Sequence, residues 1–297
     1  RYGHLDSVNY KDQIDSILRD FDLSLSGYDT ASVISRINRN ETDIVDEKFI
    51  EVFKVAQKVN IVSEGAFDIT VMPLVNAWGF GPGLKTNIDS TVIDSILQFV
   101  GMDKVRLEGN RLIKEDPGVS IDLNAIAQGY SVDVVAEFLE NEGIDNYMVE
   151  IGGEVKTRGK NPKGQIWKIG IDRPEFGNIL PGMNLKAIIE LNEKSLATSG
   201  NYRKFYEEEG VKYSHSIDPV TGYPVKQEIL SATIVGESCM IADAYATACM
   251  VTGLERAKEM VQGLDDVDAY LIYGDPEGQY QVWKTKGFEK YIVKENP

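Results

Sequence analysis

The sequence predicts an α+β protein that folds as one domain, or as two intimately packed lobes, across residues 1–297. Its 297 residues, of which 42% are apolar and 26% charged, are enough to bury a sizeable core. Predicted strands and helices follow one another without a regular β-α-β alternation, which favours α+β over a doubly wound sheet. No internal repeat, low-complexity tract or Pro/Ser-rich linker divides the chain.

Helices are predicted where apolar residues recur at helical spacing, as Ile14, Ile17 and Phe21 do. A glycine just after such a pattern marks the end of a helix, and Gly143 is predicted to end one helix in this way. The predicted helices are residues 10–25, 46–63, 89–100, the segment that ends at Gly143, the segment that begins with IADAYATACM (241–250), and GLERAKEMVQGL (253–264).

Strands are predicted in short apolar or alternating runs, with a hairpin around Gly109-Asn110. Two segments are expected to be irregular: the polar turns of 26–38, and 65–83, a strand or turn that ends in a Gly/Pro loop. The other predicted strands lie within 119–122, 146–159, 167–174, the first half of 185–200, 211–218, 229–236, 269–275 and 278–285.

The net charge of −16 argues against nucleic acid as a partner, because binding a polyanion requires Lys and Arg to displace counterions. It also argues against adsorption to anionic lipid. A small phosphate ligand is still compatible with an acidic protein if a metal ion or helix N-termini offset the charge.

No stretch has the pattern of a signal peptide or a membrane span. The longest uncharged run, residues 69–84, contains Pro73 and several glycines. The chain opens at RYGHLDSV without an initiator Met, and a removed leader is expected. Cys239 and Cys249 would lie about 15 Å apart along a helix, so we expect two buried thiols and no disulfide.

Asp243 stands alone in an apolar segment that contains no Lys or Arg. In a helix its carboxylate and the Thr247 hydroxyl, four residues on, would point to one face. Mg²⁺ prefers such oxygen ligands and commonly takes one or two carboxylates. The alternative is structural: Asp243 caps the helix and Thr247 bonds back to a carbonyl.

The segment SIDLNAIAQG places Asp122 at the end of a strand, followed by small residues and a helix. A helix N-terminus presents backbone N–H groups and suits an anion, although neither a P-loop nor GxGxxG is matched. The alternative is that Asp122 is an N-cap without a ligand.

His215 alternates with Ser214 and Ser216 before an Asp-Pro turn. Histidine is the usual general base near neutral pH, but a lone histidine is more often structural. The only other histidine, His4, is given no role. The glycine pairs in EIGGEV and ATSGNY suit close approach to a phosphate or sugar, and tight turns explain them equally well.

Taken together and in order, seven segments resemble the ApbE-type FAD:protein FMN transferases, also called thiamine-biosynthesis lipoproteins. The resemblance runs from about residue 26 to residue 248. The segments are SGYDTASVISRIN, GAFDITVMPLVNAWGFG, IDLNAIAQGYSVD, EIGGEV, ATSGNYRKF, SHSIDPVTGYP and ADAYATA.

The resemblance implies an ApbE or T-fold-like arrangement of mixed sheets with packed helices. It also implies a Mg²⁺-dependent enzyme that cleaves the FAD pyrophosphate. FMN passes to a Thr or Ser hydroxyl of a partner flavoprotein that carries an Asp-Gly-x-Thr-like motif, and AMP is released. Some relatives instead hydrolyse FAD to FMN and AMP, and a non-catalytic FAD carrier is a third possibility.

The resemblance also implies residue roles. Asp243, Thr247 and the carbonyl of Ala125 would hold Mg²⁺, and His215 would be the base that activates the acceptor hydroxyl, or a contact to FAD. Asp243 also counts as catalytic. The residues implied in FAD binding are Tyr28, Ala66, Phe67, Asp68, Asp122, Gln128, Thr198, Ser199, Gly200 and Ile217.

Two features of this chain differ from the family pattern. Many relatives have Lys at the position of Gln128, and an early Met-Gly-Thr segment that touches FAD is absent. Because family members are commonly exported lipoproteins, a place on the outer face of the cytoplasmic membrane (periplasmic) is expected. Any membrane attachment would then be a lipid anchor outside this chain.

Overall fold

The computed structural model describes residues 8–81, 88–175, 182–200, 205–208, 211–214, 216–225, 228–275 and 279–296. Its helices are α1 Lys11–Leu25, α2 Val33–Asn38, α3 Glu47–Val62, α4 Met72–Ala77, α5 Ser90–Leu97, α6 Ala127–Asn141, α7 Cys239–Thr252 and α8 Leu254–Gln262, with 3₁₀ turns η1 Met102–Lys104 and η2 Lys286–Tyr291. Its strands are β1 Val105–Glu108, β2 Arg111–Lys114, β3 Tyr147–Ile151, β4 Glu154–Arg158, β5 Trp167–Asp172, β6 Leu185–Leu191, β7 Lys194–Gly200, β8 Phe205–Glu208, β9 Val211–Ser214, β10 Ile229–Gly236, β11 Asp268–Gly274, β12 Tyr280–Lys284 and β13 Ile292–Glu295.

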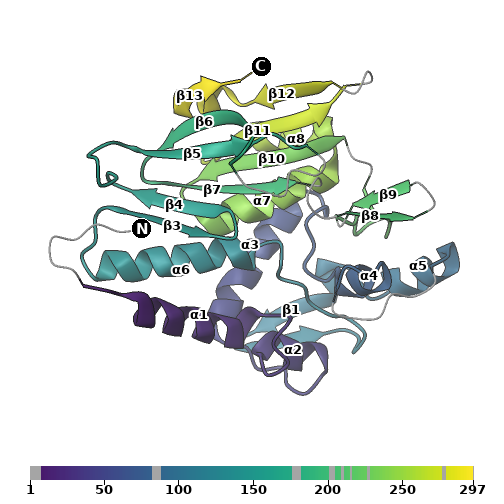
Figure 1. Ribbon diagram of the computed structural model, residues 1–297. Helices are drawn as coiled ribbons and strands as arrows, with labels where there is room; N and C mark the ends of the chain where they lie inside the picture. Colours follow the sequence, from purple (N-terminus) through teal and green to yellow (C-terminus); the bar gives the residue numbers. More distant parts are fainter. Residues whose placement is uncertain are drawn as a thin grey trace.

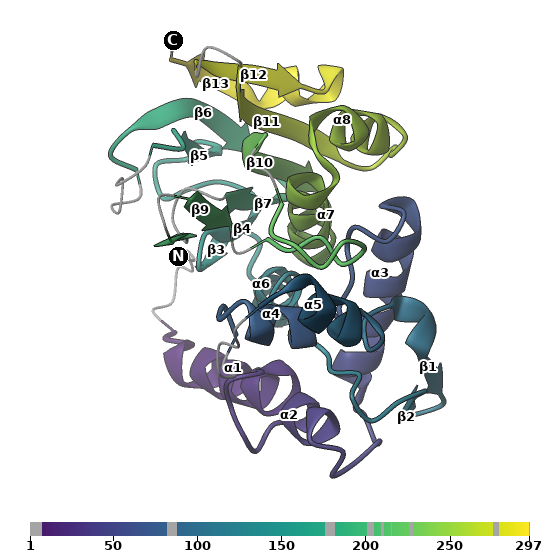
Figure 2. The same cartoon turned by 90° about the vertical axis from the view of Figure 1, so that its right-hand side faces the viewer.

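An antiparallel sheet of six strands, in the order β12-β11-β10-β7-β4-β3, forms the middle layer of the fold (Figure 1). A smaller sheet, β13-β6-β5, shares an apolar core with it on one side. Helices α6 and α7 pack on the other side, and Figure 2 shows α7 between the sheet and α3. The described strands and helices thus form the mixed α+β fold that the sequence predicts.

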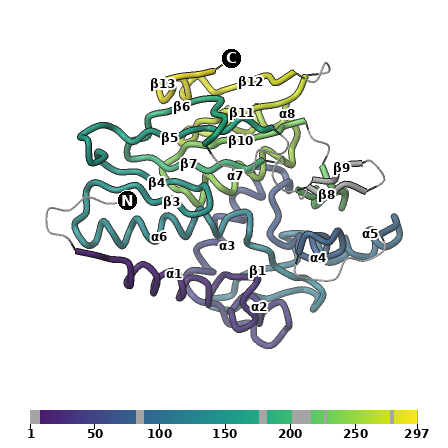
Figure 3. Tube along the Cα trace, viewed as in Figure 1, coloured from purple at the N-terminus to yellow at the C-terminus, as the bar shows by residue number. Residues whose placement is uncertain are grey.

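Helix α7 is buried on nearly all sides because it lies between β7 and β10 on one side and α3 and α6 on the other. A helix enclosed in this way has to be apolar around its whole circumference, which explains the apolar segment around Asp243. The chain trace in Figure 3 shows α1 beside α6, far from the C-terminal strands β12 and β13.

Several local predictions are confirmed by the backbone. Helices α1 and α3 lie where the apolar periodicity places them, and Gly143 follows α6 with a φ of 76°. Strands β1 and β2 form the predicted hairpin, with Glu108 opposite Arg111 and Gly109 at a φ of 62°. Both cysteines are buried and free.

Other predictions were wrong. The polar segment 26–38 contains α2, whose N-cap Ser32 accepts a hydrogen bond from Ser35 N, and 65–83 contains α4, which has a proline in its first turn. The second half of 185–200 is also a strand, β7. It begins after a tight turn at Glu193, whose φ is 53°. Residues 119–122 were predicted to be a strand, but Ser120 makes only an isolated bridge with Val71.

In the part of the chain that the structure describes, no helix is long and apolar enough to cross a membrane.

Candidate active site

A cavity of about 1120 Å³ opens beside α7, β7 and the loop before α6. This volume lies just above the range of about 300–1,000 Å³ that is typical of small-molecule and cofactor sites. The sequence-predicted site residues that the structure describes all line it; His215 lies outside the described residues, although its neighbours Ser216 and Ile217 line the cavity. Those lining residues are Tyr28, Ala66, Phe67, Asp68, Asp122, Ala125, Gln128, Thr198, Ser199, Gly200, Ile217, Asp243 and Thr247.

Asp243 lies in the second turn of α7 and is only 5% exposed. The helix cap is Ser238, whose hydroxyl accepts from Ile241 N, so the alternative that Asp243 caps the helix is wrong. Burial, and then the nearby carboxylate of Glu154, raise the pKa of Asp243 to about 8. A carboxylate in this position is costly to ionise unless a cation joins it.

The backbone of α6 approaches Asp243 closely at Gly129. Gly129 N donates to Asp243 Oδ2 over 2.9 Å. Gly129 is the third residue of α6, and its amide is one of the first-turn N–H groups that have no partner within the helix, so Asp243 supplies the acceptor. A Cβ on Gly129 would lie 2.4 Å from the Cys239 carbonyl oxygen, so this approach requires glycine.

Hydroxyl groups from β7 extend the oxygen-lined wall. Ser199 Oγ lies 3.2 Å from Thr247 Oγ1, one helical turn beyond Asp243. The neighbouring Thr198 hydroxyl instead pairs with Thr233 in the adjacent strand over 2.9 Å. The cavity therefore presents a carboxylate and two hydroxyls on one wall, and Ala125 of the loop before α6 also lines it.

The loop before α6 is fixed by Asp122. Asp122 N donates to the Ile69 carbonyl over 2.7 Å, and Asp122 Oδ1 accepts from Asn124 N over 2.9 Å. The N-cap of α6 is Ile126, which makes no side-chain cap bond, so the alternative that Asp122 is the N-cap is wrong. Burial raises the pKa of Asp122.

The carboxylate of Asp68 holds a second loop together. Its Oδ1 accepts from the amide and hydroxyl of Thr70, at 2.7 and 2.6 Å, and its Oδ2 accepts from Met102 N at 3.0 Å. Burial is the main cause that raises the pKa of Asp68, and these hydrogen bonds oppose the increase. Any ligand contact made by Asp68 has to coexist with these bonds.

Comparison with known proteins identifies the family. The model of the ApbE family matches residues 2–271. The chain belongs to the ApbE family. It is 37% identical over 297 residues to the FAD:protein FMN transferase of Vibrio cholerae, covering 98% of this chain and 87% of that protein. It is 38% identical to the protein of the same name from Haemophilus influenzae, covering 90% and 79%.

A solved structure agrees with this assignment. The fold is similar to that of the flavin transferase ApbE from Vibrio cholerae, with a TM-score of 0.88 and 35% identity, covering 98% of this chain and 94% of that one.

In this ApbE-family chain, Gln128 is bound to a residue that sequence reasoning missed. Gln128 Nε2 donates to Glu154 Oε2 and to the Ile151 carbonyl, the latter over 3.3 Å. Glu154 is 7% exposed and lines the same cavity. Gly152 leaves room for the amide, since a Cβ there would lie 1.9 Å from Nε2. The acid directly after the glycine pair of EIGGEV was the available signal.

Lys168 on β5 was missed as well. Among the described residues that line the cavity it is the one Lys or Arg, and it is half-exposed, with Nζ 3.8 Å from Glu190. Acidic side chains outnumber it; those lining the cavity are Asp68, Asp122, Glu150, Glu154, Asp172 and Asp243. A polyphosphate ligand would need additional positive charge in this cavity.

The donor set tests whether a metal fits. Within the described chain, no group of three or more His, Cys, Asp or Glu side chains is arranged to hold a metal ion. The mixed set of Asp243, Thr247 and a carbonyl offers only hard oxygen atoms. This set fits Mg²⁺, which usually keeps several waters and takes few protein ligands.

Proposed function

We propose that this protein is a Mg²⁺-dependent FAD:protein FMN transferase that moves FMN from FAD to a Thr or Ser hydroxyl of a partner flavoprotein and releases AMP. The observation that carries the proposal is the nearly buried Asp243 carboxylate at the wall of a cavity of dinucleotide size, surrounded by the motifs of the family. The names of the similar proteins from Vibrio cholerae and Haemophilus influenzae support the same activity.

Mg²⁺ would be held by Asp243, Thr247 and the carbonyl of Ala125. When bound, the ion would offset the pyrophosphate charge and polarise the FMN-side phosphorus. The contribution of the chain is to keep the carboxylate and the carbonyl on two facing elements, and Gly129 N orients the carboxylate.

FAD would lie along the cavity. Tyr28, whose side chain is 68% exposed at the cavity, has a ring face available for the flavin or the adenine. The other contacts would come from Ala66, Phe67, Asp68, Asp122, Gln128, Thr198, Ser199, Gly200 and Ile217, which line the cavity. Lys168 would add a positive charge near the phosphates.

His215 is our candidate for the base that takes the proton of the acceptor hydroxyl, because a neutral hydroxyl is a weak nucleophile. Its sequence neighbours Ser216 and Ile217 line the cavity, which supports this role. Attack by the acceptor oxygen forms a new P–O bond to FMN and breaks the pyrophosphate bond, so AMP leaves.

A FAD pyrophosphatase, with water as the acceptor, is the second candidate, because the cavity is open to solvent on the Tyr28 side. The transferase and the pyrophosphatase are distinguished by measuring AMP release from FAD. The assay is run with and without an acceptor peptide, and with and without EDTA. Transferase activity predicts AMP only when the acceptor is present. AMP and free FMN without acceptor would favour the pyrophosphatase, and no AMP in either case would overturn both.

The resemblance also supports export of the protein to the outer face of the cytoplasmic membrane. Protease treatment of intact spheroplasts tests this placement, because an exported protein is degraded and an internal one is protected.

A further inference from the structure

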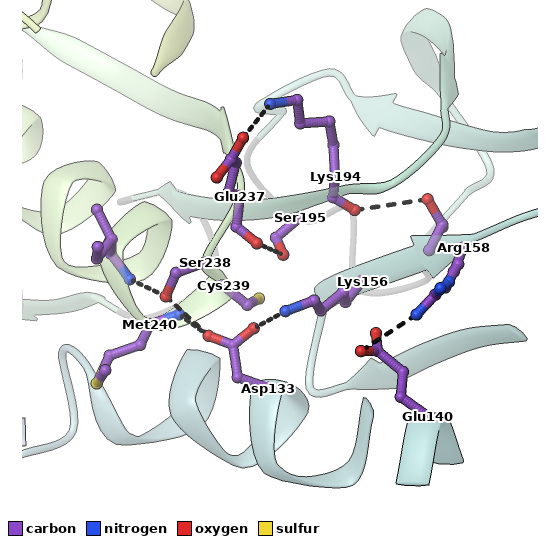
Figure 4. A network of polar contacts seen from close by, with 12 residues as sticks. Asp133, Glu140, Lys156, Arg158, Lys194, Ser195, Glu237, Ser238, Cys239 and Met240 are labelled. Carbon is purple, nitrogen blue, oxygen red and sulfur yellow. Dashed lines mark hydrogen bonds and ion pairs between the residues drawn. The ribbon is translucent and has the colours of Figure 1, made fainter. Parts of the chain in front are cut away.

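A partly buried polar network joins α6, α7 and β4 (Figure 4). Asp133 of α6 is at its centre. One carboxylate oxygen, Oδ1, accepts from Lys156 Nζ of β4 over 2.7 Å. The other, Oδ2, accepts from Ser238 Oγ over 2.8 Å and from Met240 N over 3.0 Å.

These bonds make Asp133 a cap of α7 supplied by another helix. Ser238 is the N-cap of α7, and the Met240 amide is one of the first-turn N–H groups that have no partner within the helix. A carboxylate at a helix N-terminus is also favoured by the helix dipole. The Asp133 and Lys156 side chains are only 16% and 23% exposed, so solvent screens the network weakly.

The same face of α6 contacts α7 a second time. Gly129, one helical turn before Asp133, packs against the Cys239 carbonyl and donates its amide to Asp243. Two successive turns of α6 therefore fix the first two turns of α7. The contact at Gly129 sets how closely the helices approach, and the bonds of Asp133 prevent α7 from sliding or rotating.

We propose that Asp133 is a positioning residue for the metal site, holding α7 so that Asp243 and Thr247 face the carbonyl of Ala125. The inference rests on the proposed function, in which the donors come from two separate elements. Ala125 lies in the loop that leads into α6, whereas Asp243 and Thr247 lie on α7. The relative position of α6 and α7 therefore sets the donor separations, and Mg²⁺ tolerates little deviation from octahedral geometry.

The chain contains a matched control on the same helix and strand. Glu140 of α6 pairs with Arg158 of β4 over 3.2 Å, two turns beyond Asp133. Like the pair of Asp133 and Lys156, it joins α6 to β4 (Figure 4), but its carboxylate makes no bond to α7 among the described contacts. Glu140→Gln therefore removes an α6–β4 ion pair and leaves the cap of α7 in place.

The test is Mn²⁺ binding, measured by electron paramagnetic resonance without FAD, on wild type, Asp133→Ala and Glu140→Gln. Loss of a residue that orients metal ligands typically lowers metal affinity by about 10–100-fold. We expect a loss of this size for Asp133→Ala and a change within about twofold for Glu140→Gln. A folded Asp133→Ala variant that binds Mn²⁺ as tightly as wild type would overturn the inference.

If Asp133→Ala does not fold, Ser238→Ala replaces it, since this change removes one bond of the network and leaves the charge pair. Weaker Mn²⁺ binding supports the inference, and unchanged affinity overturns it. Turnover gives a second readout: in a positioning variant more Mg²⁺ is needed for half-maximal rate, while a merely less stable variant has a normal Mg²⁺ requirement. Wild-type protein that fails to bind Mn²⁺ would overturn the proposed metal site itself.

Discussion

Replacing Asp243 by Asn is expected to stabilise the metal-free protein while abolishing its Mg²⁺-dependent activity. The carboxylate is 5% exposed, and its pKa in the folded protein is raised to about 8 by burial and by Glu154. In the unfolded chain an Asp has a pKa of about 3.9. Asn has nearly the same shape and still offers Gly129 N an acceptor, but it carries no charge.

The magnitude follows from the difference between the two pKa values. Because the pKa of Asp243 is higher in the folded than in the unfolded protein, its protonation favours folding. The contribution of this one group to the free energy of unfolding is greatest at low pH and is lost as the pH rises from about 4 to about 8. At pH 7 folding requires the carboxyl to bind a proton, and at about 1.4 kcal/mol per pKa unit this costs roughly 4 kcal/mol. Asn avoids this cost, so we expect the melting temperature in EDTA to rise by about 5 °C or more.

Thermal unfolding in EDTA and in saturating MgCl₂, at pH 5 and pH 8, measures both parts of this prediction. Mg²⁺ should raise the melting temperature of wild type, more so at pH 8 because the ion competes with a proton, and should leave the Asn variant unchanged. A variant less stable than wild type in EDTA at pH 8, or equal stabilisation of both proteins by Mg²⁺, would show that Asp243 is neither a destabilising buried carboxylate nor a metal ligand.

Three further substitutions test other parts of the structure. Gly129→Ala should lower the free energy of unfolding by about 1–3 kcal/mol and weaken Mn²⁺ binding, because the new Cβ would lie 2.4 Å from the Cys239 carbonyl oxygen. Unchanged unfolding and binding would contradict the close approach of α6 to α7. Lys168→Gln should raise the KM for FAD by up to about fivefold with little change in kcat, measured by steady-state kinetics. An unchanged KM would show that Lys168 does not contact the phosphates of FAD. Trp78→Phe removes the 2.8 Å hydrogen bond from Trp78 Nε1 to the Gly222 carbonyl. The free energy of unfolding in urea should fall by about 1 kcal/mol, and the 218–222 turn should become more sensitive to limited proteolysis. Unchanged stability and proteolysis would show that this bond does not hold the turn.

Much of the fold could be predicted from local pattern. Long helices such as α1 and α3 have clear apolar periodicity, and the β1–β2 hairpin has glycine at the position where φ is positive. The short helices α2 and α4 could not be predicted in this way, because six residues give too few turns for a period to show. Helix α2 has a side-chain cap from Ser32, whereas α4 has no side-chain cap and a proline in its first turn, and both depend on tertiary packing.

Strand β7 was missed for a different reason. Its sequence, KSLATSG, is small and polar with no alternation, and it becomes a strand because β10 and β4 pair with it on both sides. Such pairing depends on segments far away in the chain, so local propensity has little predictive value here.

The candidate site was predicted as a set of residues but not as a geometry. The motifs named the residues that line the cavity, yet the bond from Gly129 N to Asp243 joins residues 114 positions apart. A single sequence carries no record of such a contact. Asp133 was missed for the same reason, since an isolated acid acquires its role only from the neighbours that folding brings to it.

FMN transfer itself is tested by the intact mass of an acceptor peptide containing Asp-Gly-x-Thr, incubated with this protein, FAD and Mg²⁺. We expect a mass gain equal to one esterified FMN on the threonine, with release of AMP. We also expect no gain in EDTA or with Asp243→Asn. An unmodified peptide in the presence of folded wild-type protein, FAD and Mg²⁺ would contradict the proposed transfer.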